Sequence, residues 1–373
     1  MGTPHRVLIL GGYGFFGGRI AAQLCKNRRV QLVLAGRDLE KATAMAYQLG
    51  MSAEHARAVD AESPQLAAQL QKLRIHTVIH TAGPFQEQDY TVAQAAIRAG
   101  ANYLDLADGR RFVAGITTLD AAARAAGVRV VSGVSSLPAL TTAVIDRYLD
   151  QFQKLEAVRI GISSGAVIPG IATLRAILGY CGQPFETLEN GRWITVHGWL
   201  DTRAHDFPKP VGTRLLGRCD VPDLDLLPKR YPGLKTVNFH AGFASDAGHR
   251  FVEWVAKRVQ TGKMRSALPL APLVNTIGKW MQPLLSDRGA MFIRMEGPHV
   301  ENGAPHALTW NLIARENHGP NIPCAAAIAL TGKLAAGAVL PVGAMPCMGL
   351  LDVQDMMDTL KGLSVRELAP ETI

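Results

Sequence analysis

Cysteine is scarce in this sequence, and its cysteines lie far apart. The chain has 373 residues and 5 cysteines, no two of which form a C-x-x-C pair. This pattern excludes a disulfide-stapled secreted domain and a zinc ribbon, and it predicts reduced thiols in a cytoplasmic protein. The 11 histidines form no H-E-x-x-H motif or other close ligand set, so no metal site is expected. The cysteines are Cys25, Cys181, Cys219, Cys324 and Cys347.

Charged residues are also few, and the basic ones do not cluster. Lys, Arg, Asp and Glu make up 19% of the chain, and the formal net charge is +8. Because no long basic run and no aromatic-rich basic motif occurs, the positive charge predicts a basic surface that favours an anionic cofactor, and no nucleic-acid partner. The sequence around Ser135 lacks a G-x-S-x-G elbow, which argues against nucleophilic hydrolysis.

Long uninterrupted apolar runs are absent as well, and no signal peptide is expected. Residues 321–348 are apolar but contain Lys333 and several prolines, which predicts a buried helix and loop rather than a membrane span. Residues 268–285 carry Trp280 and could lie on a lipid surface or line an apolar tunnel. Core packing is the default expectation for both stretches, so no membrane contact is expected.

A glycine-rich stretch near the start organises the first domain. Residues 7–10 are apolar and predict a buried strand, and Gly12, Gly14 and Gly17 after it fit the spacing G-x-G-x-x-G. A helical pattern follows, so the N–H groups of its first turn would face a pyrophosphate. The sequence therefore predicts a dinucleotide cofactor held by the loop Gly12, Tyr13, Gly14, Phe15 and Phe16.

The end of the second predicted strand, residues 30–35, indicates which cofactor binds. Gly36 and Arg37 follow this strand, and Lys41 lies one helical turn further on. An acidic side chain here usually binds the ribose of NAD, whereas an arginine fits a 2′-phosphate through two parallel hydrogen bonds. We therefore predict NADP(H) in preference to NAD(H). Asp38 is an acidic residue at the same strand end and on its own would favour NAD(H). Its position before a helical pattern, however, predicts that it is an N-cap.

Strands and helices alternate as far as residue 131, which predicts a doubly wound parallel sheet of the Rossmann type. Asp60 ends the third predicted strand and could accept a hydrogen bond from the adenine amine. Ala82, Gly83 and Pro84 follow the fourth strand, beside the switch point where ligands bind. We expect this loop near the nicotinamide ribose.

The sequence predicts a second α/β domain after the first. We assign residues 1–137 to the Rossmann domain, 138–320 to a substrate and dimerisation domain with a mixed or antiparallel sheet, and 321–373 to helices that pack back on the first domain. Asn302-Gly303 lies between two strand-like stretches and predicts a hairpin turn. The proline-rich stretch 207–233 is expected to be irregular.

Several of these segments together resemble the saccharopine dehydrogenase-like oxidoreductases. The segments are the glycine turn 11–17, Ala35-Gly36-Arg37, Ala82-Gly83-Pro84-Phe85, residues 100–106 and residues 133–138. The likeness covers about the first 140 residues and is faint beyond them. It implies an NADP-type cofactor, a homodimer, and a small-molecule substrate such as an amino acid that forms an imine. It also implies an arginine-lined substrate pocket in the second domain.

The resulting hypothesis is an NADP(H)-dependent oxidoreductase acting on a C=N or C=O carbon, with an apolar carbonyl compound as the other possible substrate class. Tyr103, Asp105, Ser135 and His197 are the candidates for proton donor or substrate contact, and Asp105 at a strand end is the best placed of them. An alternative is a regulatory protein that binds NADP without turnover, as NmrA-like sensors do. Tyr231 and Lys235 match the spacing of a short-chain reductase motif, but a proline and a glycine between them argue against the required helix.

Overall fold

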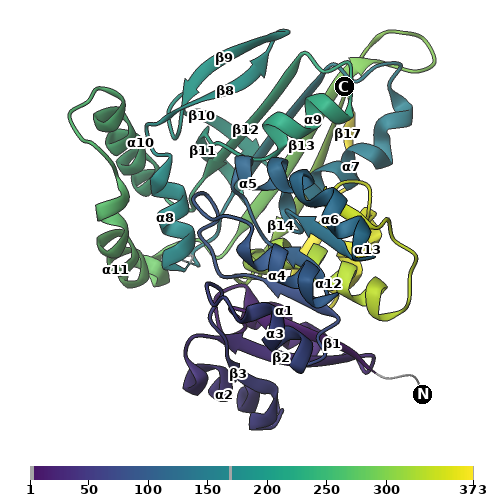
Figure 1. Cartoon of the computed structure of the whole chain (residues 1–373). Coiled ribbons are helices and arrows are strands. Elements are labelled where there is room, and N and C mark those ends of the chain that lie inside the picture. The colour runs from purple at the N-terminus through teal and green to yellow at the C-terminus, as the bar shows by residue number, and fades with distance from the viewer. Residues whose placement is uncertain (1–3, 168–169, 373) are drawn as a thin grey trace. The chain divides into compact units, whose positions relative to one another are not determined.

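The computed structural model of the chain describes residues 4–167 and 170–372. The chain divides into two compact units, each built from separate stretches of sequence. Unit 1 runs to Ala143 and takes in Asn321–Leu360, and unit 2 consists of Val144–Pro320 with the residues from Lys361 on. Figure 1 shows the elements of each unit.

Unit 1 contains a seven-stranded sheet in the order β15-β6-β5-β4-β1-β2-β3, and its strand pairs are all parallel. Strand β1 pairs with β2 on one side and with β4 on the other, so the strand order reverses there. Residues 7–10 of β1 are at most 2% exposed, as expected for a strand buried on both faces. The strands are β1 His5–Leu10, β2 Val30–Gly36, β3 Ala56–Ala58, β4 Thr77–His80, β5 Asn102–Asp105, β6 Arg129–Ser132 and β15 Gly343–Pro346.

The helices of unit 1 follow the strands in the chain, and this arrangement confirms the predicted Rossmann-type class. Between β5 and β6 the chain forms two short helices, which a 3-10 turn at Ile116–Leu119 separates. The helices are α1 Gly17–Leu24, α2 Leu39–Gln48, α3 Leu66–Lys72, α4 Thr91–Ala99, α5 Arg110–Gly115, α6 Asp120–Ala125, α12 Ile322–Ala335 and α13 Val353–Thr359.

Unit 2 is built on a mixed sheet of ten strands, in which β7 and β12 run parallel and the other pairs are antiparallel. Strands β13 and β14 form the hairpin that Asn302-Gly303 predicts. The strands are β7 Ala157–Ser163, β8 Pro184–Glu189, β9 Arg192–His197, β10 Arg203–Phe207, β11 Gly212–Arg218, β12 Thr236–Gly242, β13 Gly289–Pro298, β14 Pro305–Ala314, β16 Val365–Glu367 and β17 Glu371–Thr372. Helix α7, Thr141–Tyr148, crosses the boundary between the units, and unit 2 holds α8 Ile171–Gly179, α9 Asp223–Arg230, α10 Asp246–Gln260 and α11 Ala271–Met281.

Two stretches differ from their predictions. The stretch 207–233 is not irregular, because it contains β11 and α9. Its prolines lie outside β11, and Pro228 lies within α9. The segment 321–373 does not belong wholly to the first domain: β15 adds to the sheet of unit 1, whereas β16 and β17 pair with β14 in unit 2. These strand pairings join residues far apart in the chain, so local sequence patterns do not reveal them.

Candidate dinucleotide site

The turn after β1 leaves no room for a side chain at Gly11 or Gly17. Gly11 has φ +87°, a left-handed conformation that favours glycine, and its amide donates to the Ala35 carbonyl at 2.8 Å. A Cβ on Gly17 would lie 2.2 Å from the Gly11 carbonyl oxygen. The left-handed residue of the turn is thus Gly11, which the G-x-G-x-x-G spacing did not single out, while Gly17 provides the close approach of α1.

The loop leaves backbone donors at the N-terminus of α1. The Gly14 amide donates to the Gly11 carbonyl at 2.8 Å, and the Gly18 amide donates to the Gly14 carbonyl at 3.0 Å. Within the described parts of the chain, the amides of Tyr13, Phe15 and Phe16 have no backbone partner. Donors of this kind at a helix N-terminus, with the positive end of the helix dipole, suit a bound anion.

The loop after β4 is fixed beside the glycine turn by side chains that the sequence did not identify. The Thr81 hydroxyl donates to the Leu10 carbonyl at 2.9 Å and to the Gly11 carbonyl at 3.2 Å. The Gln88 side chain donates to the carbonyls of Ala82 and Pro84, at 2.8 Å each. Ala82, Gly83 and Pro84 are therefore held, partly exposed, next to the first loop. Thr81 opens a loop that the sequence did indicate, but nothing local pointed to Gln88.

Tyr13 joins the glycine loop to the end of β2. Its hydroxyl accepts a hydrogen bond from the Asp38 amide at 3.1 Å. Its ring lies so close to Gly36 that a Cβ there would be 2.5 Å from a ring carbon. A side chain at position 36 would therefore displace the Tyr13 ring, and the two loops predicted to hold the cofactor are in contact.

Arg37 and Lys41 differ in their ion-pair and hydrogen-bond partners. Lys41 forms an ion pair with Asp38 at 2.7 Å, and its amide donates to the same carboxylate, which caps α2 as predicted. The hydrogen bonds from Lys41 lower the pKa of Asp38 below its usual value. Arg37 is exposed, and across residues 4–167 and 170–372 no ion pair or hydrogen bond of its guanidinium is present. Arg37 is therefore the available cation at this strand end.

Asp60 follows β3 and is exposed. Its carboxylate accepts a hydrogen bond from the Glu62 amide at 3.1 Å, which closes a local turn. One oxygen of Asp60 is thus engaged by its own loop, and the other faces solvent. The assignment of this residue to the adenine stays a prediction.

Asp105, at the end of β5, is fully buried. One carboxylate oxygen accepts hydrogen bonds from the Ala107 amide at 3.0 Å, the Ser132 hydroxyl at 2.9 Å and the Gly133 amide at 2.8 Å. Burial raises the pKa of Asp105 to about 6, although these hydrogen bonds act to lower it. Asp105 therefore ties the end of β5 to the turn after β6.

Tyr103 and His80 form a buried pair beside Asp105. The Tyr103 hydroxyl lies 3.1 Å from His80 Nδ1, and both side chains are at most 2% exposed. Burial lowers the pKa of His80 to about 4, so the imidazole is neutral at pH 7. Burial, with the neighbouring Asp105 charge, raises the pKa of Tyr103 well above its usual value. This arrangement makes Tyr103 a poor proton donor at neutral pH.

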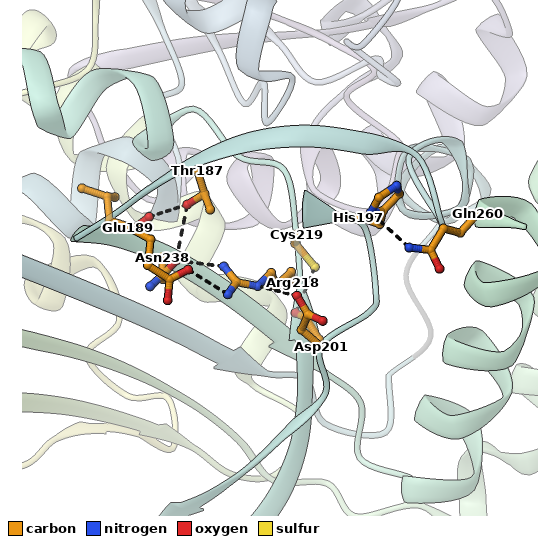
Figure 2. Close-up of polar contacts among 10 residues, drawn as sticks. Thr187, Glu189, His197, Asp201, Arg218, Cys219, Asn238 and Gln260 are labelled. Carbon is orange, nitrogen blue, oxygen red and sulfur yellow. Dashed lines mark hydrogen bonds and ion pairs between the residues drawn. The ribbon is translucent and has the colours of Figure 1, made fainter. Parts of the chain in front are cut away.

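The other two catalytic candidates lie apart from this buried group. Ser135 is partly exposed, two residues beyond the Gly133 that Asp105 holds. His197 belongs to β9 in unit 2, where its Nδ1 lies 3.3 Å from the Gln260 amide nitrogen. Figure 2 shows the His197 ring facing Gln260. The structure thus groups Tyr103 with Asp105 and places Ser135 on an adjoining turn.

Arg218 of unit 2 is 5% exposed and fully engaged (Figure 2). Its guanidinium donates to Asp201 at 3.0 Å, to Asn238 at 3.0 Å and to Glu189 at 3.1 Å. A buried arginine with this many partners holds strands together and is not available to a substrate carboxylate. On the same sheet, Arg159 and Arg294 both bind Glu296, whose pKa their hydrogen bonds lower.

Comparison with known proteins adds to this geometry. Residues 7–131 match the family model described as the saccharopine dehydrogenase NADP binding domain. No curated protein matches the chain. Apo saccharopine dehydrogenase (L-Glu forming) from Saccharomyces cerevisiae has a similar structure, with a TM-score of 0.70 and 15% identity over 99% of this chain and 100% of that one.

Two further solved structures are similar along most of their length. A homospermidine synthase from Legionella pneumophila, in complex with NAD, has a TM-score of 0.60 and 10% identity, over 98% of this chain and 91% of that one. An amine dehydrogenase from Mycobacterium smegmatis has a TM-score of 0.51 and 12% identity, over 92% of this chain and 94% of that one. At these identities the likeness establishes the two-unit fold and nothing of the substrate.

Proposed function

We propose that the chain is an NADP(H)-dependent oxidoreductase, because residues 7–131 match the family model described as the saccharopine dehydrogenase NADP binding domain. The proposed reaction moves a hydride to or from a C=N or C=O carbon. The observation that supports the cofactor choice is the free guanidinium of Arg37 beside a glycine turn that has no room for a side chain at Gly11 or Gly17.

The residues present fit such a cofactor. Within the loop Gly12–Phe16, the amides of Tyr13, Phe15 and Phe16 would hold the pyrophosphate, and Arg37 would hold the 2′-phosphate. Lys41 contributes less, because Asp38 already neutralises it. The loop Ala82–Pro84, which Thr81 and Gln88 hold in place, would lie against the nicotinamide ribose. When bound, the nicotinamide supplies or accepts the hydride.

We assign Asp105 and Tyr103 a positioning role, because neither side chain is exposed. Asp105 fixes the turn at Ser132-Gly133, and this turn carries Ser135. Ser135 in unit 1 and His197 in unit 2 each stay a predicted candidate for proton donor or substrate contact. The small-molecule substrate and the homodimer stay predictions from the family resemblance.

Calorimetric titration with NADPH and NADH tests the cofactor assignment. The Arg37→Ala variant should bind NADPH about 10- to 150-fold more weakly, because a charged hydrogen-bonded contact contributes about 1.5–3 kcal/mol, whereas its affinity for NADH should hardly change. Arg28→Ala is a matched control, since Arg28 is also exposed but precedes β2 at the other end of the strand. An equal loss for both cofactors, or an equal loss in the control, would refute the 2′-phosphate assignment.

A regulatory NADP-binding protein without turnover is the second candidate. The observation that favours it is that three arginines of the unit 2 sheet, Arg159, Arg218 and Arg294, are paired with acidic residues of the chain. Nicotinamide absorbance, followed with saccharopine and with panels of keto acids, aldehydes and amines, separates the two. Turnover establishes the oxidoreductase, and tight NADPH binding with no turnover favours the regulatory protein.

A further inference from the structure

Helix α11 exposes a continuous row of large apolar side chains. Leu273, Ile277, Trp280 and Leu284 are 54%, 47%, 79% and 79% exposed, respectively. Their spacing places them on one face of a helix that continues into the short 3-10 turn Gln282–Leu284. We name these four residues the apolar row. The expectation that residues 268–285 pack in the core is therefore wrong for this face, and an exposed group of this kind commonly marks an interaction surface.

The chain around the apolar row is basic. Between Lys257 and Ser286 the sequence contains no Asp or Glu. All its lysines and arginines are exposed: Lys257, Arg258, Lys263, Arg265 and Lys279. A two-fold contact with a second copy of this face would bring these like charges together, which is unfavourable. An anionic surface complements both the charge and the apolar row.

A second exposed group lies on α10, in the same unit. Phe251 and Trp254 are 45% and 50% exposed, with ring centroids 6.2 Å apart. The Arg258 guanidinium lies 4.6 Å from the centre of the Trp254 ring. Within unit 2, α8, α10 and α11 gather on one side of the sheet (Figure 1), and α8 packs against α11. Aromatic and basic side chains thus extend beyond the apolar row itself.

We propose that the apolar row of α11 docks onto an anionic lipid surface. The helix would lie in the plane of the interface, with the apolar row among the acyl chains and the exposed cations at the headgroups. Trp280 is well suited to the boundary between headgroups and acyl chains, because its ring is apolar and its N–H can still bind water or headgroups. In the described portion of the sequence, no helix is long and apolar enough to cross a bilayer.

Sedimentation with vesicles of phosphatidylcholine containing phosphatidylserine tests this proposal on the full chain. The protein should pellet with these vesicles at low salt and be released at high salt, and it should bind pure phosphatidylcholine weakly. The double variant Trp280→Ala, Leu284→Ala should bind at least about tenfold more weakly, since it removes two large apolar side chains from the interface. Lys263→Gln and Lys279→Gln should each weaken binding by about fivefold.

Matched controls separate docking from loss of folding. Trp193 on β9 is 47% exposed and Lys229 on α9 is exposed, and neither lies near α11 in sequence, so Trp193→Ala and Lys229→Gln should leave vesicle binding unchanged. Thermal unfolding followed by circular dichroism verifies that each variant is folded. The proposal is overturned if the native chain does not bind the anionic vesicles, or if the controls lose as much binding as the apolar-row variants. Self-association that only the apolar-row variants abolish, without vesicle binding, would instead identify a second copy as the occupant.

Discussion

A single buried carboxyl illustrates how one residue supports the candidate site. Asp105 accepts three hydrogen bonds on one oxygen, two of them from backbone amides after β5 and β6. Without an acceptor, each buried amide costs about 1–3 kcal/mol. The strand-end turns that would face a nicotinamide therefore depend on a group that itself lies out of solvent.

The raised pKa of Asp105 predicts a distinctive pH dependence of stability. The carboxyl has a pKa of about 6 when folded against 3.8 ordinarily, so between these values the folded state binds the extra proton. The contribution of Asp105 is therefore most favourable below about pH 4 and is lost as the pH rises through about 6. At pH 7 the free energy of unfolding is therefore lower than its value below pH 4 by on the order of 3 kcal/mol from this group.

Urea unfolding of the native protein and of Asp105→Asn at pH 7 and pH 4.5 measures this effect. Asn keeps an acceptor for the three donors but cannot titrate, so between pH 7 and pH 4.5 the native protein should gain about 2 kcal/mol relative to the variant. His80 opposes this trend, since its lowered pKa destabilises the folded state as the pH falls, but it is present in both proteins. The same pH dependence in both proteins would show that Asp105 does not titrate in this range.

At the scale of elements, the β1–α1 unit depends on one close contact. Gly17 and Gly18 are neighbours at the start of α1, but their surroundings differ. A Cβ on Gly17 meets the Gly11 carbonyl at 2.2 Å, whereas one on Gly18 meets the end of the flexible Met45 side chain at 3.0 Å. Only the first of these contacts cannot be relieved by a side-chain movement.

Two alanine variants test this difference. Gly17→Ala should push α1 away from the turn and abolish dinucleotide binding, as measured by NADPH titration. Gly18→Ala should keep binding and should gain about 0.5–1 kcal/mol of stability from the better helix former. NADPH binding by Gly17→Ala at native affinity would show that the turn is more compliant than its geometry indicates.

The sequence identified the local parts of this site and missed the parts that depend on distant contacts. The glycine loop and Arg37 could be located because strand, turn and helix follow one another within about 30 residues. The left-handed conformation of Gly11 and the role of Gln88 were missed, since they depend on the conformation of one turn and on a carbonyl across a loop. The exposure of α11 was also missed, because the same apolar spacing fits a buried or an exposed face.

At the scale of the whole molecule, unit 1 is completed by a late segment. Helix α12 packs against α1, and the Cys324 thiol lies 3.7 Å from the Phe16 carbonyl of the glycine loop. Strand β15 extends the sheet beside β6. Unit 2 is completed in the same way, because Glu367 on β16 binds Arg147 and Trp310.

Truncations distinguish the contributions of these two late segments. A chain ending at Pro320 lacks α12 and β15, so it should lose NADPH binding. A chain ending at Leu360 keeps both and loses only β16 and β17, so it should bind NADPH while the strands of unit 2 exchange their amide hydrogens faster. Hydrogen exchange and NADPH titration of the two chains provide the measurements, and unaltered binding by the shorter chain would contradict the role given to α12.

The interleaving of the two units also constrains how the chain is made. Residues reach the ribosomal exit in order, and domains generally fold as they emerge. The sheet of unit 1 is complete only after β15 is synthesised, about 200 residues after β6. The sheet of unit 2 is complete only after later strands are synthesised. The edge of β6 is therefore unpaired for most of synthesis, which makes nascent unit 1 a natural client for chaperones until its last strand arrives.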